Sequence, residues 1–155
     1  MIKLSTKGRY GLRAMIELAG SYGQGPLMMS EISRRQGVSR KYLHALLTSL
    51  KEAGLVRSQR GARGGYELAH PPEDILARDI FVALEGDIAV VDCVHDEKLC
   101  KRSEHCQARE VWTSLSEAME RVLTGVTLAT LACPKKVEKT SSPPERAEAA
   151  AGGSD

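Results

Sequence analysis

The chain has 155 residues, of which 27% are charged, and its formal net charge is only +2. This length corresponds to one ordinary domain, or to a small domain with an added arm, built around one modest core. No segment approaches the roughly 20 apolar residues of a membrane-spanning helix, and the first residues lack the apolar run of an export signal. These features exclude a transmembrane protein, so we expect a soluble, cytoplasmic protein with no membrane partner.

Positive charge is concentrated between residues 34 and 63. This window holds eight Lys and Arg residues against one acidic residue, Glu52, so it carries +7 and the remainder of the chain carries −5. Clustered lysine and arginine are typical of a surface that binds the phosphate backbone of nucleic acid. The alternative is a solvated face without a partner. The charges fall on a recognisable scaffold, which favours nucleic-acid binding.

Three helices are expected in the N-terminal third of the chain. Ser5 or Thr6 caps the first. Its apolar residues recur at helical spacing: Leu12, Met15, Ile16 and Ala19. The second helix spans 31–36, and Gly37 ends it as a left-handed C-cap. Ser39 caps the third, whose apolar stripe is Leu43, Leu46, Leu47 and Leu50. A short helix, a glycine-containing turn and a capped helix together form a helix-turn-helix pattern.

The third helix directs polar side chains away from its leucine stripe. A helix lying in the major groove presents its N-terminal residues to base edges, so contacts with bases or phosphates are expected there. The candidates on this helix are Ser39, Arg40, Lys41, Tyr42 and His44. Two interpretations of Tyr42 stay open: it packs beside the leucine stripe, or its hydroxyl reaches a phosphate.

A β-hairpin is expected after the third helix. Residues 55–58 and 66–69 have strand character and flank the glycine-rich turn 59–65. Such a hairpin forms a wing, whose candidate DNA contacts are Arg57, Arg60 and Arg63. Arginines on a flexible tip can enter a narrow, electronegative minor groove. A plain hairpin with solvated arginines is the alternative. The turn lacks the Gly-Lys-Ser/Thr ending of a phosphate-binding loop, which excludes nucleotide binding.

Three cysteines share one short polar segment that follows a helix expected over 78–85. Cys93, Cys100 and Cys106 are separated by six and five residues. Zinc sites usually pair cysteines about two to four residues apart, whereas a multi-iron cluster needs thiolates spread around it. The spacing therefore favours an iron–sulfur site first and zinc second. A thiol switch based on disulfides among these cysteines is a further alternative. No Cys-x-x-Cys or protease-like signature frames a cysteine, so we do not expect an enzyme.

An amphipathic helix is expected after the cysteine segment. Apolar residues from Val111 to Val126 repeat at steps of three and four, which predicts a long helix over 109–133. Such a helix is well placed to pair with its copy in a homodimer, and two-fold symmetry matches a palindromic operator. Packing against its own domain is the alternative. The expected fold is mainly α with a small β-hairpin wing, divided into a winged helix-turn-helix domain (1–86), a cysteine loop (87–108), a dimerisation helix (109–133) and a disordered tail (134–155).

Several motifs together carry a resemblance to a known family. They are the opening 4–10 (Leu-Ser-Thr-Lys-Gly-Arg-Tyr), the turn Gly37-Val38-Ser39 with Tyr42-Leu43, the wing 60–66, and Ala83-Leu84-Glu85-Gly86 before the three-cysteine loop. In these the chain resembles the IscR and NsrR type of bacterial transcription regulator, the Rrf-two family. The resemblance implies a homodimeric winged-helix repressor or activator of double-stranded DNA. It implies that an iron–sulfur cluster, 2Fe-2S favoured and 4Fe-4S possible, sets DNA affinity in response to iron–sulfur status, redox or nitric oxide stress.

Carried over by position, the resemblance assigns the cluster thiolates to Cys93, Cys100 and Cys106, and DNA contacts to Lys41, His44 and Arg60. The chain departs from the pattern at the fourth ligand. IscR-type proteins have five residues rather than six between the first two cysteines, and a histidine three residues after the third, where this chain has Arg109. NsrR-type proteins can take a carboxylate from near the N-terminus, where this chain has Gly8.

The fourth ligand must therefore be another residue, because an arginine stays protonated and cannot bind iron. The candidates are His95, Glu97, Glu104 and His105, of which His105 is favoured. Cys133 follows the long helix and is expected to be a buried or free thiol, with a ligand role as the alternative.

Overall fold

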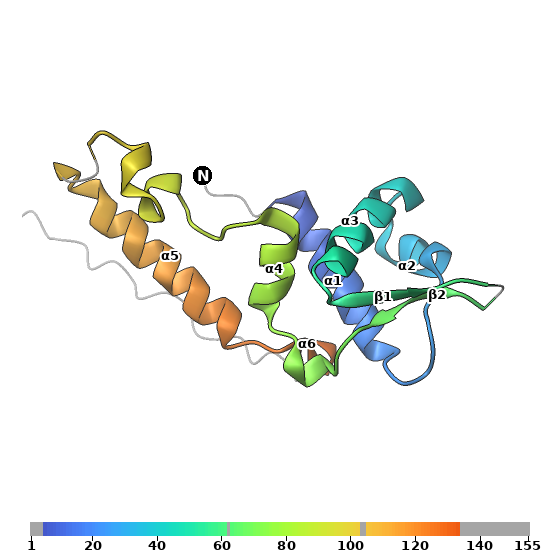
Figure 1. Ribbon diagram of the computed structural model, residues 1–155. Helices are drawn as coiled ribbons and strands as arrows, with labels where there is room; N and C mark the ends of the chain where they lie inside the picture. Colours follow the sequence, from blue (N-terminus) through green and yellow to red (C-terminus); the bar gives the residue numbers. More distant parts are fainter. Residues whose placement is uncertain (1–4, 62, 103–104, 134–155) are drawn as a thin grey trace, which may run out of the picture.

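The computed structural model describes residues 5–61, 63–102 and 105–133. It confirms a mainly helical fold with a two-stranded antiparallel hairpin (Figure 1). The α-helices are α1 (Thr6–Gly20), α2 (Met29–Gln36), α3 (Arg40–Glu52), α4 (Ala77–Glu85), α5 (Ala108–Thr124) and α6 (Leu128–Ala132). The strands are β1 (Val56–Gln59) and β2 (Gly65–Leu68), and the 3-10 turns are η1 (Pro72–Asp74), η2 (Asp92–Val94) and η3 (Glu97–Leu99). None of the helices in the described ranges is long and apolar enough to cross a membrane.

The core of the winged unit lies around α1. This helix is capped by Ser5, whose Oγ accepts a hydrogen bond from the Gly8 N–H, and it buries one apolar face. The largest fully buried side chains come from α1 and from the segments packed against it: Met15, Leu18, Ile32, Leu43, Leu47, Leu50, Val56, Leu68, Ile75, Ile80 and Leu128. The leucine stripe predicted for the third helix is therefore core, which leaves the opposite face of α3 free for a partner.

Local signals fix the helix-turn-helix. Gly37 ends α2 with φ +65°, a left-handed conformation that glycine adopts at low cost. Ser39 then caps α3, its Oγ accepting from the Tyr42 N–H at 3.2 Å. The second helix begins at Met29, two residues earlier than predicted, because the Met28 carbonyl already accepts hydrogen bonds from the N–H groups of Glu31 and Ile32.

The wing pairs β1 with β2 in a register that places Val56 opposite Leu68 and Gln59 opposite Gly65. The backbone of Leu27 joins the far side of β2, exchanging two 2.9 Å hydrogen bonds with Tyr66. A Cβ at Gly65 would stand 2.4 Å from the Leu27 carbonyl oxygen, so only glycine allows this approach. The hairpin is thus attached to the segment that leads into α2.

The helix predicted over 109–133 is two helices. The long one, α5, ends at Thr124, and the Val126 carbonyl accepts a 2.9 Å hydrogen bond from the Ala77 N–H at the start of α4. Thr127 then caps α6, which packs against α1 and η1 and buries Leu128 completely. Residues 127–133 therefore contribute to the winged core, whereas α5 stands apart from it, with α4 lying between α5 and α1 (Figure 1).

Candidate nucleic-acid interface and cysteine loop

The face of α3 opposite the core carries exposed basic residues. Arg40, Lys41 and His44 are all exposed, in the first two turns of the helix. Further along, the Lys51 ammonium donates to the Ser58 hydroxyl of β1 at 2.9 Å. This contact ties the helix to the wing, so both are presented as one unit.

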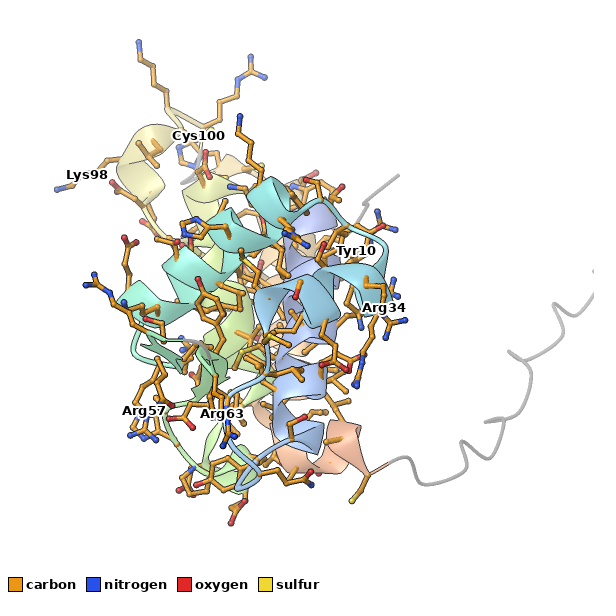
Figure 2. All side chains as sticks on the ribbon, turned by 90° about the vertical axis from the view of Figure 1, so that its right-hand side faces the viewer. Tyr10, Arg34, Arg57, Arg63, Lys98 and Cys100 are labelled. Atoms are coloured by element: carbon orange, nitrogen blue, oxygen red, sulfur yellow. The ribbon has the colours of Figure 1, made fainter. Side chains whose placement is uncertain are left out.

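The wing carries two exposed arginines at its turn, Arg60 and Arg63, while Ala62 between them lies outside the described residues. Arg57 is also exposed, but it faces Glu67 across the hairpin at 3.8 Å, which offsets part of its charge. Figure 2 looks onto this end of the molecule and shows Arg57 and Arg63 on the hairpin and Arg34 on α2. Lys98 and Cys100 of the cysteine loop lie well away from them in the same view.

A hollow of about 460 Å³ lies between the helix-turn-helix and the wing. Its lining includes Arg40 from α3, Arg60 and Gln59 from the wing, and Ser30 from α2. Two arginines that are distant in sequence thus border one concave surface, and α3 and the wing present positive charge together.

Tyr42 lies among aromatic and apolar neighbours. Its ring meets the Tyr10 ring edge-on, with centroids 6.1 Å apart and an interplanar angle of 89°. The Tyr42 hydroxyl is buried, and no hydrogen-bond partner for it is found among the described residues. This placement favours the packing interpretation of Tyr42, because a phosphate contact would require the hydroxyl to leave its buried position.

Arg35 belongs to the basic window but has an internal role that the charge count did not indicate. Its guanidinium pairs with Glu17 of α1 at 2.9 Å and with Glu31 of α2 at 2.5 Å, and the hydrogen bond to Glu17 is the main cause of its raised pKa. Gln36 also donates to Glu17, at 2.7 Å. Arg35 thus fixes α2 on α1. The i,i+4 spacing of Glu31 and Arg35 signals the ion pair within α2, whereas no spacing in the sequence indicates the contact with Glu17 of α1.

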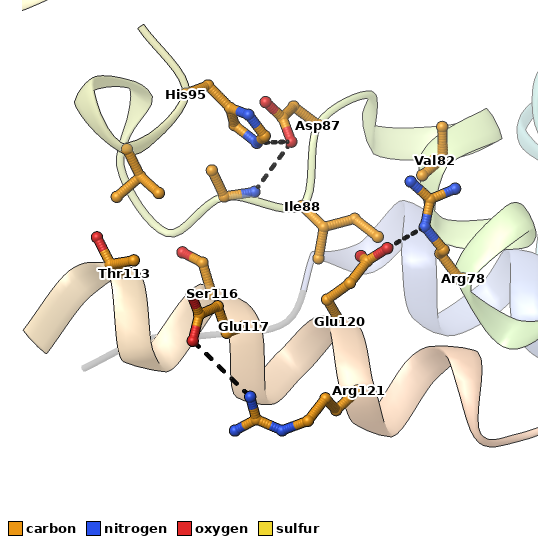
Figure 3. Close-up of a pocket in the computed structure, with 12 residues that line it drawn as sticks. Arg78, Val82, Asp87, Ile88, His95, Thr113, Ser116, Glu117, Glu120 and Arg121 are labelled. Atoms are coloured by element: carbon orange, nitrogen blue, oxygen red, sulfur yellow. Dashed lines mark hydrogen bonds and ion pairs between the residues drawn. The ribbon is translucent and has the colours of Figure 1, made fainter. Parts of the chain in front are cut away.

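The cysteine loop connects α4 to the N-terminus of α5 and is held to α5 by polar contacts. The Ser116 hydroxyl of α5 accepts from the Val90 N–H at 3.1 Å, and Arg109 pairs with Glu97 of η3 at 2.7 Å. His95 lies 2.5 Å from the Asp87 carboxylate (Figure 3). A cavity of about 530 Å³ lies between α4, the loop and α5, where Arg78 of α4 also pairs with Glu120 of α5.

The thiols predicted as cluster ligands are free, and Cys93, Cys100 and Cys106 are all half-buried on this loop. Three soft thiols on one loop are the donor type that iron–sulfur clusters and zinc require. Within the described ranges, however, no three metal-ligating side chains are gathered at one point. The donor chemistry of the three thiols nevertheless fits a metal centre.

The candidates for the fourth ligand are placed differently from one another. His105 is exposed, and Glu104 lies outside the described residues. His95 contacts the Asp87 carboxylate, and Glu97 forms an ion pair with Arg109. Arg109 stands in the first turn of α5, and its pairing with Glu97 closes the loop by an ion pair. Cys133 is exposed at the end of α6, on the winged unit and apart from the cysteine loop.

A winged helix-turn-helix whose recognition helix and wing share an exposed basic face defines a class of DNA-binding protein. The sequence matches the Rrf2 family, described as iron-dependent transcriptional regulators, over residues 4–134. The chain belongs to this family and is a DNA-binding transcriptional regulator rather than an enzyme.

Similar proteins agree with this assignment. The transcriptional regulator CymR of Bacillus subtilis (strain 168) is 44% identical over 131 residues, which cover 84% of this chain and 90% of CymR. The solved structure of CymR (YrzC), the global cysteine regulator of B. subtilis, superposes with a TM-score of 0.71 at 43% identity, covering 85% of this chain and 97% of that one. The solved structure of IscR from T. potens superposes with a TM-score of 0.69 at 40% identity, covering 84% of this chain and 85% of that one.

Proposed function

We propose that this regulator binds double-stranded operator DNA as a homodimer, with α3 in the major groove and the wing in the adjacent minor groove. The observation that carries the proposal is the shared hollow between Arg40 of α3 and Arg60 of the wing. The proposed contacts on α3 are Ser39, Arg40, Lys41 and His44, and those on the wing are Arg57, Arg60 and Arg63. Tyr42, a residue of α3 itself, supports the position of this helix by packing against Tyr10 of α1.

The dimer is proposed to form through α5. None of the residues of this helix is buried within the chain, and two large apolar side chains, Val111 and Val122, are 59% and 65% exposed. Beside it lies a largely apolar cavity of about 960 Å³, bordered by Leu12 of α1, Phe81 of α4, and Met119 and Leu123 of α5. An exposed apolar surface of this kind is costly in water and is typical of a subunit interface. A two-fold dimer of winged domains would read a palindromic operator.

The cysteine loop is proposed to be the sensor of this cytoplasmic regulator, with Cys93, Cys100 and Cys106 as ligands of an iron–sulfur cluster and His105 as the favoured fourth ligand. When bound, a cluster of this kind supplies a redox-sensitive centre that also responds to nitric oxide. Support comes from the three half-buried free thiols and from the similarity to IscR. The loop is joined to α4 and α5, so a change in its conformation reaches both the winged unit and the proposed interface.

The protein should be purified without oxygen, and its visible absorption spectrum recorded with iron, sulfide and zinc content per monomer. Coloured protein with iron and sulfide is the expected result. Colourless protein that stays colourless after attempted cluster reconstitution would remove the cluster from the account.

A second candidate is a regulator whose cysteine loop works without a cluster, through thiol–disulfide chemistry or a zinc ion. The observation that favours it is the ion pair between Arg109 and Glu97, which joins the loop to α5 through protein side chains. The similarity to the global cysteine regulator of B. subtilis also gives it weight. Zinc without iron in the purified protein, or a loop disulfide formed on oxidation, would favour this candidate.

A further inference from the structure

The first turn of α1 receives a carboxylate from a distant part of the chain. Glu85, the last residue of α4, accepts hydrogen bonds through Oε1 from the Ser5 hydroxyl and from the Gly8 N–H, the latter at 2.8 Å. The first turn of α1 has no acidic residue of its own. A carboxylate at a helix N-terminus satisfies otherwise unpaired N–H groups and interacts favourably with the helix dipole. Glu85 therefore supplies from α4 the charge that α1 lacks.

Glu85 lies immediately before the cysteine loop in the chain. Gly86 follows at once, with φ +85°, a conformation that only glycine adopts readily, and the chain then enters the segment that leads to the cysteines. In that segment the Asp87 carboxylate accepts from the Ala89 N–H, and Val90 donates to Ser116 of α5. The carboxylate that holds α1 thus sits directly at the start of the cysteine loop.

Through Ser5 and Gly8, Glu85 is also connected to α1, the helix against which the helix-turn-helix packs. The first half of α1 lies directly against α4, where a Cβ at Gly8 would stand 2.6 Å from Phe81. The same α1 helix buries Met15 and Leu18 in the core and holds α2 through the pairing of Glu17 with Arg35. A shift of the loop that moves Glu85 is therefore transmitted to the helix on which the helix-turn-helix is mounted.

We propose that Glu85 is a positioning residue that couples the cysteine loop to the DNA-binding unit through its contacts with Ser5 and Gly8. The inference rests on the proposed function, in which the state of the loop sets operator affinity. The inference adds that Glu85 is the residue through which a change in the loop conformation is transmitted to α1. Loss of the carboxylate should uncouple the two regions while leaving both of them folded.

The test is a double-mutant cycle read by operator affinity, using anaerobically purified full-length protein and a duplex selected from random sequence by the wild type. Cys100→Ala changes the loop, Glu85→Gln removes the charge with little change of shape, and Glu73→Gln is the control, an exposed carboxylate in η1. In the wild-type and Glu73→Gln backgrounds, Cys100→Ala should change operator affinity by about 5-fold or more, within the usual range of allosteric coupling. In the Glu85→Gln background the change should fall below about 2-fold.

Ser5→Ala provides a second variant, since it removes one of the two donors and should give an intermediate effect. Hydrogen exchange of the first turn of α1 gives an independent reading: the Gly8 N–H should exchange faster in Glu85→Gln than in Glu73→Gln. A full Cys100→Ala effect in the Glu85→Gln background would overturn the coupling role alone. No Cys100→Ala effect in the wild type would overturn both the coupling and the sensor role of the loop.

Discussion

Gly11 of α1 and Leu84 of α4 lie in direct contact: a Cβ added at position 11 would stand 2.0 Å from the Leu84 Cδ1. Leu84 is 7% exposed, so its side chain has little free space into which it can move. Gly11→Ala should therefore lower the free energy of unfolding by about 1–3 kcal/mol, the usual cost of overpacking a core. Urea denaturation measures this change.

Gly20→Ala is the matched control for Gly11→Ala. It lies on the same helix, and among the described residues no neighbouring atom stands within 4 Å of the position that a Cβ would take there. Because alanine is the better helix former, Gly20→Ala should leave stability unchanged or raise it by up to about 1 kcal/mol. Equal effects of the two substitutions would mean that the contact between α1 and α4 is looser than the distance from Gly11 to Leu84 indicates.

Tyr42→Phe tests whether the Tyr42 side chain packs or binds DNA. Its hydroxyl is buried without a hydrogen-bond partner among the described residues, and such a group costs free energy in the folded state. The variant should be as stable as the wild type, or more stable by about 1 kcal/mol, and its affinity for duplex DNA should be unchanged. Thermal unfolding and fluorescence anisotropy check the two parts. A clear loss of DNA affinity would instead show that the hydroxyl contacts a phosphate.

Val122→Glu places a charge on the exposed apolar face of α5 next to Met119 and Leu123. If this face pairs with its copy, burying an unpaired carboxylate there should dissociate the dimer. Light scattering after size-exclusion chromatography should report a monomer with unchanged helix content. Ser114→Glu, at an exposed position on the polar side of α5, should remain dimeric. A dimer that persists in Val122→Glu would place the interface elsewhere.

Cys100→Ser removes one of the three thiols of the loop, and Cys133→Ser removes the exposed thiol at the end of α6. If the loop holds the cluster, Cys100→Ser should lose its iron and sulfide, whereas Cys133→Ser should keep both. The two variants should show the same circular dichroism as the wild type, because neither sulfur is buried in the core. Loss of iron from Cys133→Ser would make Cys133 a ligand.

The helix-turn-helix could be predicted because its signals are local: Gly37 and Ser39 mark the turn, and the leucine stripe marks the buried face of α3. The division between α5 and α6 was missed, although local signals mark it as well: Gly125 ends α5 and the Thr127 side chain caps α6, and a tertiary hydrogen bond adds to these signals. Gly125 has an ordinary helical φ of −76°, so the chain leaves the helix where Ala77 binds the Val126 carbonyl. The apolar repeat continued across that point and indicated a single helix.

In the candidate site too, some features could be predicted from the sequence and others depend on tertiary contacts. The basic window predicted an exposed cationic face, yet charge alone did not distinguish Arg40, which is exposed, from Arg35, which is held by Glu17. The cysteine spacing indicated a metal site, but the conformation of the loop depends on ion pairs such as Arg109 with Glu97, which follow no periodic pattern. The fourth ligand stays a prediction for the same reason.

The salt dependence of binding to duplex DNA tests the central claim most directly, because each lost phosphate contact reduces the magnitude of the negative slope of log K against log salt by about 0.9. The double variant Lys41→Ala/Arg60→Ala should bind more weakly than the wild type, and the magnitude of its slope should be smaller by about two. Arg121→Ala, an exposed arginine on α5, is the control for loss of a positive charge and should retain the wild-type slope. Equal slopes for the double variant and the wild type would contradict the assignment of α3 and the wing as the DNA-binding surface.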